Sequence, residues 1–304
     1  MSYYRTLGLS AEPFSTSPDP AFFYGSTEHR AALCRLQISI ALKRGLSVMA
    51  GDIGAGKTTI GRRLAQVLCE DENVTFRMIL NPYFRTEKQF LSRMAALFHV
   101  PVRDERHATA LDYMEAIERY LFTVGVEENR TVVLLIDEAQ ILPDFVFEVL
   151  RILLNYETNE FKILQLVLAG QLELLPRIAA MPNFWDRIAT KVMLKPLAPG
   201  DVRDLIQARL RAAGYAGSQP LFTPEAVERI HAHTGGLPRR VNILCHNVLE
   251  YLVMYDKKYA DLNTVQQVIE RESAADDFRN IVFEQETARQ HDDGQGGFLR
   301  VVNA

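Results

Sequence analysis

The chain contains the segment Val48-Met49-Ala50-Gly51-Asp52-Ile53-Gly54-Ala55-Gly56-Lys57-Thr58-Thr59. It has the spacing G-x-x-x-x-G-K-T, with a short apolar run before it and a helical pattern after it, which is the context of a phosphate-binding loop. The glycines allow backbone N–H groups to wrap closely around a polyphosphate, and the following helix contributes the positive end of its dipole. We therefore expect Gly51 to Thr59 to bind the phosphate groups of a nucleotide.

Two side chains of this loop have predicted chemical roles. We expect Lys57 to reach the outer phosphates and the hydroxyl of Thr58 to bind a magnesium ion. The alternative is an ordinary glycine-rich turn between a strand and a helix, with a lysine that points to solvent. The apolar run and the helical periodicity on either side favour the phosphate-binding interpretation.

The composition is that of an ordinary folded protein. With 304 residues, 48% of them hydrophobic and 24% charged, the chain is long enough for one large α/β domain and a smaller second domain. Its net charge of −4 excludes a strong overall attraction to nucleic acid or anionic membranes, but it leaves room for a local basic surface. No run approaches the length of a membrane-spanning helix, so we expect no membrane span.

The three cysteines, Cys34, Cys69 and Cys245, lie far apart in apolar helical patterns. Their odd number and the lack of C-x-x-C spacing argue against a disulfide framework and against a zinc site. We expect all three to be small buried side chains in a reducing compartment. Because the N-terminus also lacks a basic segment followed by an apolar one, the expected location is cytoplasmic.

Apolar strand-like runs alternate with helical patterns over most of the chain. The run Thr131–Ile136 is almost entirely apolar and rich in β-branched residues, which is typical of a central strand that helices cover on both faces. The alternation predicts an α/β fold with a parallel five-stranded sheet and right-handed crossovers. The expected strands are 46–50, 74–80, 131–136, 163–169 and 191–194, and the expected helices are 27–44, 57–69, 86–98, 108–124, 144–156 and 172–180.

The chain divides into four predicted parts. Residues 30–199 carry the alternation and form a nucleotide-binding domain, whereas helical patterns alone fill 200–272. Residues 273–304 are polar, acidic and then glycine-rich, which predicts a flexible tail. Prolines exclude a regular helix from much of residues 1–29, and we expect this extended segment to pack on the nucleotide-binding domain. Its aromatic residues either pack in that interface or line a base pocket, and the pattern favours neither: Phe14, Phe22, Phe23 and Tyr24.

Two adjacent carboxylates, Asp137 and Glu138, follow directly after the apolar run that ends at Ile136. Residues at the exit of a central strand face the ligand side of an α/β sheet. We expect Asp137 to bind, through water, the same magnesium ion as Thr58, and Glu138 to orient and polarise an attacking water molecule. The ion also offsets the repulsion between the two carboxylates. The alternative is an acidic pair that caps a helix, which the upstream phosphate-binding loop disfavours.

Further segments carry a family pattern: Tyr3–Leu9, Glu12–Phe14, Pro18–Tyr24, Asp137–Gln140, Leu168–Gln171 and Gly235–Asn242. Together with the phosphate-binding loop they resemble the AAA+ ATPases, and more narrowly the general secretion pathway A family, the ExeA-like ATPases. The core is also similar to that of TnsC- and TniB-type transposition ATPases and of origin-recognition ATPases. The resemblance covers residues 1 to about 272, and it implies that the helical domain is a lid over the nucleotide.

The resemblance implies roles for further side chains. Gln171 matches the first sensor, a polar residue that contacts the outer phosphate. Arg239 matches the second sensor, an arginine that the lid brings onto the nucleotide, and the neighbouring Arg240 is the less favoured choice. Arg187 matches the arginine finger, which stabilises charge on the γ-phosphate in the site of a neighbouring subunit. Where the family often has another arginine four residues on, this chain has Lys191, which lacks the planar fork of arginine.

The implied activity is hydrolysis of ATP with Mg²⁺ in a self-associated ring or filament, and the catalytic residues are Lys57, Glu138, Gln171 and Arg187. Two cellular roles fit the resemblance. One is an ExeA-like ATPase whose protein client is secretion or envelope-assembly machinery, which the N-terminal motifs favour. The other is a DNA-binding regulator that presents target DNA to a transposase, which the expected lack of a membrane span favours. A third interpretation, a nucleotide-gated scaffold with little turnover, is disfavoured by the presence of Glu138.

Overall fold

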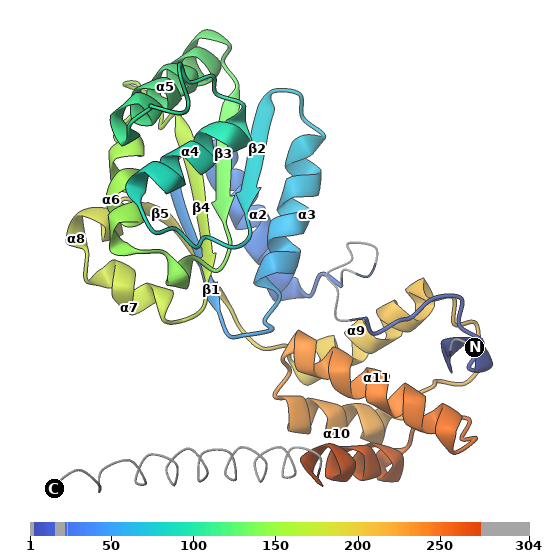
Figure 1. Ribbon diagram of the computed structural model, residues 1–304. Helices are drawn as coiled ribbons and strands as arrows, with labels where there is room; N and C mark the ends of the chain where they lie inside the picture. Colours follow the sequence, from blue (N-terminus) through green and yellow to red (C-terminus); the bar gives the residue numbers. More distant parts are fainter. Residues whose placement is uncertain (1–2, 16–21, 23, 275–304) are drawn as a thin grey trace, which may run out of the picture.

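The computed structural model describes residues 3–15, 22 and 24–274 of the chain. In these residues an α/β domain and a helical domain form two lobes, and residues 195–198 connect the last strand to the first helix of the second lobe (Figure 1). The predicted tail lies almost entirely outside the described residues, as do Phe23 and most of the proline-rich part of the N-terminal segment.

Five parallel strands form the sheet, in the order β2-β3-β4-β1-β5. This confirms the predicted α/β class and the five-stranded parallel sheet. The last strand begins at Ile188 rather than at Lys191, because buried and exposed residues alternate along this edge strand and weaken its apolar signal. The strands are β1 (Leu46–Gly51), β2 (Val74–Ile79), β3 (Thr131–Ile136), β4 (Leu164–Gly170) and β5 (Ile188–Leu194).

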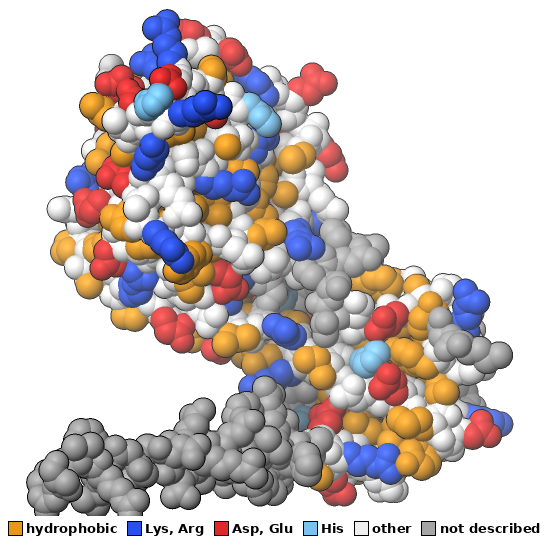
Figure 2. All heavy atoms as spheres, viewed as in Figure 1, with side chains coloured by type: hydrophobic (Ala, Val, Ile, Leu, Met, Phe, Trp, Pro, Cys, Tyr) orange, Lys and Arg blue, Asp and Glu red, His pale blue; other side chains and the backbone are white. Residues whose placement is uncertain are grey.

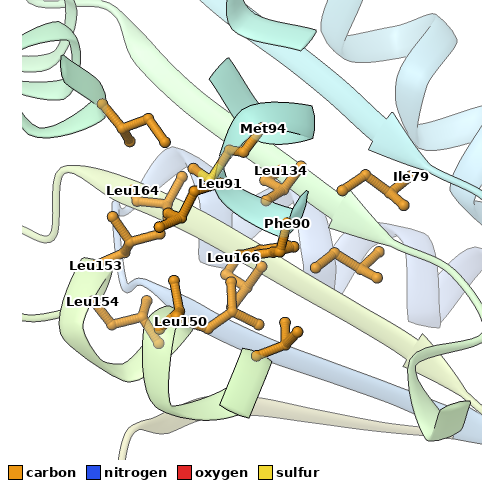
Figure 3. Packing of buried hydrophobic residues seen from close by; sticks show 14 of the residues in the cluster. Ile79, Phe90, Leu91, Met94, Leu134, Leu150, Leu153, Leu154, Leu164 and Leu166 are labelled. Atoms are coloured by element: carbon orange, nitrogen blue, oxygen red, sulfur yellow. The ribbon is translucent and has the colours of Figure 1, made fainter. Parts of the chain in front are cut away.

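Helices cover both faces of the sheet, so successive residues of a strand enter different cores. In β3, Leu134 packs in the core formed with α4, α5 and α6, whereas Leu135 packs in the core formed with α2 and α3 (Figures 1 and 3). This burial on both faces explains the nearly continuous apolar run of the strand. The helices of this domain are α2 (Thr27–Ala41), α3 (Lys57–Cys69), α4 (Glu87–Phe98), α5 (Ala110–Phe122), α6 (Asp144–Leu153), α7 (Leu174–Ala179) and α8 (Pro182–Trp185).

The C-terminal region is helical, as predicted. It contains α9 (Pro199–Ala212), α10 (Pro224–Thr234), α11 (Pro238–Met254) and a helix over residues 262–274. Each of the first three has a proline in its first turn, where the missing N–H costs no helical hydrogen bond. The helices enclose a core of their own, separate from the two cores of the sheet.

Residues 3–15 of the N-terminal segment pack on the helical domain, where packing on the nucleotide-binding domain was expected, whereas His29 at the end of the segment contacts the phosphate-binding loop. Phe14 is 1% exposed and lies in the core of α9 to α11, where its ring meets that of Phe222 edge-on at 6.1 Å. The backbone N–H and the hydroxyl of Ser10 both donate to the carbonyl of Ala213, each at 2.8 Å. The physical reason is that Leu9 and Phe14 complete the small core of the helices.

Two of the three cysteines also differ from the expectation. Cys34 and Cys69 are exposed, and Cys245 alone is buried, where burial raises the pKa of its thiol. Cys34 lies on the side of α2 opposite to Ala32 and Leu36, which face the sheet. The apolar residues around Cys34 in the sequence indicate a helix, but they do not indicate which side of the helix is buried. Among the described helices, none combines the length and apolar character that crossing a membrane requires.

Candidate nucleotide-binding site

A cleft lies where the C-terminal ends of the strands meet the helical domain. It is lined by the phosphate-binding loop and the start of α3, by residues that follow β3 and β4, and by residues of α9 and α11. Ligands of open α/β sheets bind at this edge of the sheet. Five side chains with predicted roles line the cleft: Lys57, Thr58, Glu138, Gln171 and Arg239.

The phosphate-binding loop uses the left-handed backbone that glycine permits. Gly54 has a φ of +81° and Gly56 a φ of +100°. A Cβ atom on Gly54 would lie 2.7 Å from the Cβ of Arg239, and one on Gly56 would lie 3.0 Å from Nε2 of His29. Helix α3 begins at Lys57, directly after this turn, so its N-terminus lies at the cleft. The loop therefore has the arrangement that binds phosphate groups.

The ammonium group of Lys57 lies inside the loop. The side chain is 5% exposed, and Nζ donates hydrogen bonds of 2.8 Å to the carbonyl oxygens of Gly51 and Asp52. Burial lowers the pKa of Lys57, while the nearby carboxylates of Glu138 and Asp137 favour its charged form. A positive group is thus held at the point where the loop, α3 and the carboxylates meet.

Thr58 and Asp137 are in direct contact. The hydroxyl of Thr58 donates to Oδ2 of Asp137 at 2.5 Å, and Oδ1 accepts from the backbone N–H of Glu138 at 3.0 Å. Asp137 is 2% exposed, and burial raises the pKa of its carboxyl although the hydrogen bond from Thr58 opposes this. A buried carboxylate beside a hydroxyl is a set of hard oxygen donors, so these two residues fit Mg²⁺.

Two glutamine side chains hold the carboxylate of Glu138. Nε2 of Gln140 donates to Oε2 of Glu138 at 2.6 Å, and Nε2 of Gln171 donates to the same oxygen at 3.3 Å. Oε1 of Gln140 also accepts from the backbone N–H of Gln171 at 3.0 Å. Glu138 has a φ of +53° and turns the chain into the short helix η3 (Ala139–Ile141). Gln140 was not among the predicted site residues, because its position depends on this turn.

A buried histidine supports the loop from the side of α2. His29 is 4% exposed; its Nε2 lies 2.9 Å from the carbonyl oxygen of Ala55, and its Nδ1 lies 2.7 Å from the hydroxyl of Ser26. Sequence reasoning missed this residue. A histidine in a helical pattern carries no distinctive signal, and the contact joins residues 26 positions apart.

The helical domain reaches the loop through the start of α11. The backbone N–H of Arg239 donates to the carbonyl of Gly54 at 3.2 Å, and Arg239 lines the cleft, whereas Arg240 does not. This agrees with the preference for Arg239 as the lid arginine. A guanidinium in this place is suited to bind phosphate oxygens.

The remaining lining of the cleft is partly aromatic and apolar. It includes Phe22, Tyr24 and Leu197. Apolar walls with a few polar groups suit a nucleobase, and Asn242, which is 7% exposed, contributes an amide to the same lining. Of the N-terminal aromatic residues, Phe14 therefore packs in a core, whereas Phe22 and Tyr24 line the cleft.

Of the four predicted catalytic residues, Arg187 is the one that does not line this cleft. It lies between α8 and β5, where its guanidinium donates to Oδ1 of Asn155 at 2.6 Å and to the carbonyl of Asn183. The nearby Lys191 places Nζ 3.8 Å from the ring centroid of Trp185. A residue that acts in the site of a neighbouring subunit has to lie outside its own cleft.

Comparisons with known proteins identify the family and the fold. Residues 41–178 match the family model described as an AAA domain. This match contains the phosphate-binding loop and the strand-end carboxylates, so the chain carries a P-loop domain of the AAA class. Within this class, it is 37% identical over 249 residues to the General secretion pathway protein A of Aeromonas hydrophila. The match covers 81% of this chain and 44% of the relative, so the chain spans less than half of that protein.

Solved structures share the fold. The Aeropyrum pernix ORC2 protein, in ADPNP–ADP complexes, is 17% identical with a TM-score of 0.59, over 81% of this chain and 67% of that chain. The Aeropyrum pernix ORC1 protein in complex with DNA is 16% identical with a TM-score of 0.59, over 86% and 69%. The resemblance to AAA+ ATPases, to the ExeA-like relative and to the origin-recognition core is therefore confirmed.

Proposed function

We propose that the chain binds ATP together with Mg²⁺ in the cleft and hydrolyses it to ADP and phosphate. The contact between Thr58 and Asp137, beside the ammonium of Lys57, carries this proposal. It joins a loop hydroxyl, a buried cation and a strand-end carboxylate in one place, although Asp137 lies 79 positions after Thr58 in the sequence. The AAA domain supports the same activity.

Thr58 and Asp137 are the proposed magnesium-binding residues. A bound ion would neutralise phosphate charge and polarise the γ-phosphate. In its presence the charged form of Asp137 is favoured, although burial raises the pKa of this carboxyl. The backbone N–H of Glu138 holds the other carboxylate oxygen and so orients the group.

Glu138 is the proposed residue that orients and polarises the attacking water. Both amide donors bind its Oε2, so Oε1 is the oxygen that is left to accept from water. The two amides hold the carboxylate in place, and a carboxylate oxygen can accept a hydrogen bond from water. We therefore assign Gln140 a positioning role, and Gln171 a position between this carboxylate and the outer phosphate.

The proposal includes an assembly controlled by the nucleotide. Arg239 would close the lid on the phosphates, and Arg187 would complete the site of a neighbouring subunit in a ring or filament. For the cellular role we favour an ExeA-like one, with secretion machinery as the client. The identity to the General secretion pathway protein A supports this choice.

The test of the activity is ATP hydrolysis by purified protein over a range of protein concentrations. We expect the rate per subunit to rise with concentration, because each site needs a neighbour. Lys57→Ala is expected to lose ATP binding, and Glu138→Gln to keep binding and lose hydrolysis. Protein that binds ATP but shows no hydrolysis under any oligomerising condition contradicts the proposed activity.

DNA binding separates the two cellular roles. The ExeA-like role predicts no ATP-dependent shift of DNA in a gel, in agreement with the net charge of −4 and with the mixture of basic and acidic side chains on the face in Figure 2. The alternative rests on the fold that the chain shares with a DNA-bound ORC1 protein. An ATP-dependent shift that weakens steeply with added salt would favour the transposition-type alternative.

A further inference from the structure

Ser26, His29 and Ala55 form a buried chain of hydrogen bonds between the start of α2 and the phosphate-binding loop. Their exposed fractions are 0%, 4% and 1%. The carbonyl of Ala55 can only accept, so Nε2 of His29 carries the proton that it donates at 2.9 Å. In the neutral ring Nδ1 then accepts from the hydroxyl of Ser26, at 2.7 Å. The oxygen of Ser26 in turn accepts from the backbone N–H of His29 at 3.3 Å.

This chain of hydrogen bonds sets the orientation of the peptide between Ala55 and Gly56. In a trans peptide the C=O group and the following N–H group point in opposite directions, and the described chain has no cis peptide. Because the oxygen of Ala55 points at His29, the N–H of Gly56 points away from it. The ring also prevents movement of the loop toward α2, since even a Cβ on Gly56 would lie only 3.0 Å from Nε2.

We infer that His29 is a positioning residue of the phosphate-binding loop, which keeps the Ala55–Gly56 peptide in the orientation that presents N–H groups to phosphate. The inference rests on the proposed nucleotide binding. Ser26, the N-cap of α2, completes the arrangement because its hydroxyl donates to Nδ1 in the tautomer that the carbonyl of Ala55 selects. Tyr24 lies two residues before Ser26, and its hydroxyl donates to Asp201 of α9 at 3.3 Å. The same short segment therefore contacts both the helical domain and His29.

Two amide variants test this role. The amide of His29→Gln reaches the position of Nε2, whereas that of His29→Asn reaches only the position of Nδ1. We expect His29→Gln to bind ATP with Mg²⁺ within about threefold of the unchanged protein, and His29→Asn to bind about tenfold more weakly, which corresponds to about 1.4 kcal/mol. Binding is measured by calorimetry, and Tm without nucleotide is expected to be equal for both variants. In steady-state hydrolysis we expect the KM for ATP to rise in His29→Asn. We expect kcat, the rate at saturating ATP, to stay unchanged.

Further variants complete the test. His233→Asn is the matched control, because this histidine is exposed and lies outside the cleft. The ATP affinity of this variant is expected to equal that of the unchanged protein. Ser26→Ala removes the donor to Nδ1 and so loosens the hold on the ring, and we expect a weaker loss of affinity than for His29→Asn. Should His29→Asn not fold, Ser26→Ala decides: ATP affinity equal to that of the unchanged protein overturns the inference.

Failure of this inference is distinguishable from failure of the proposed function. If folded His29→Asn and His29→Gln bind ATP equally well while Lys57→Ala loses binding, the inference is overturned and the proposed function stands. If the unchanged protein binds no ATP, both are overturned. Recovery of binding by glutamine but not by asparagine is the result that a purely structural role for the ring does not produce.

Discussion

Asp137 is a buried residue beside the cleft, and it lowers stability at the place where it has a proposed function. Its carboxyl is buried, and burial raises its pKa even though Thr58 donates a hydrogen bond to it. A raised carboxyl pKa means that the folded state disfavours the charged form. The stability associated with this group is therefore full at low pH and is lost as the pH rises through the folded-state pKa.

From this we predict that Asp137→Asn raises the Tm of the nucleotide-free protein near pH 7. The asparagine can keep both hydrogen bonds, because its oxygen accepts from Glu138 and its N–H group can donate to the hydroxyl of Thr58. A gain of 1 kcal/mol corresponds to about 2–4 °C for a domain of this size.

The gain is expected to shrink as the pH falls toward the ordinary Asp pKa of about 3.9, and the variant is expected to lose Mg²⁺-dependent ATP binding. Thermal unfolding at several pH values checks this. An unchanged or lower Tm at pH 7 would contradict it.

At the scale of elements, residues 3–15 of the N-terminal segment are part of the helical domain. The hydroxyl of Tyr3 and the ring of His246 on α11 are 2.8 Å apart, and Glu12 lies 3.1 Å from the same ring nitrogen. With Leu9 and Phe14 in the core of the helices, the segment contributes both polar and apolar contacts. A small helical domain has little interior of its own, so each large buried side chain counts.

Phe14→Ala is therefore expected to destabilise the helical domain by about 3–5 kcal/mol, the usual cost of removing a buried phenylalanine. Denaturant unfolding followed by circular dichroism measures this loss. Tyr83→Ala is the control, because Tyr83 is 67% exposed, and its effect is expected to stay within about 0.5 kcal/mol. Equal stability of the two variants would show that the segment does not contribute to the fold.

At the scale of the whole molecule, the cleft exists only because two lobes meet. The α/β domain supplies the loop and Glu138, and the helical domain, the second lobe in Figure 1, supplies Arg239 and Asn242. Arg187 lies outside this cleft. In the sequence it comes directly before β5, whereas the helical domain follows that strand. The proposed site is therefore complete only in an assembly.

A mixing experiment tests this assembly. Arg187→Ala and Glu138→Gln are each expected to lose hydrolysis, the first through its missing arginine and the second through its missing carboxylate. In a mixture, an Arg187→Ala subunit has an intact carboxylate and can receive the arginine of a Glu138→Gln neighbour. Random mixing of equal amounts makes about one head-to-tail interface in four competent, so activity returns. If the mixture stays inactive while both variants bind ATP, Arg187 does not act between subunits.

Much of the fold follows from local pattern. Residues 131–136 were predictable as a central strand because nearly all of them are apolar, so neighbouring side chains can be buried on both faces of the sheet. The helix that begins at Lys57 and the preceding turn follow from glycine spacing within a few residues. By contrast, the start of β5 and the exposure of Cys34 depend on which face of the strand or helix is buried. The number of apolar residues in a segment does not reveal that face.

The same division holds for the site. The phosphate-binding loop was predictable because its backbone conformation depends on glycines within the loop itself, and Asp137 and Glu138 were predictable because a buried strand delivers them to its end. The support by His29, the hold of Gln140 on Glu138 and the packing of Phe14 on the helices required the tertiary structure. Each of these depends on contacts between segments that are distant in the chain or on a left-handed turn, and packing alone decides such contacts.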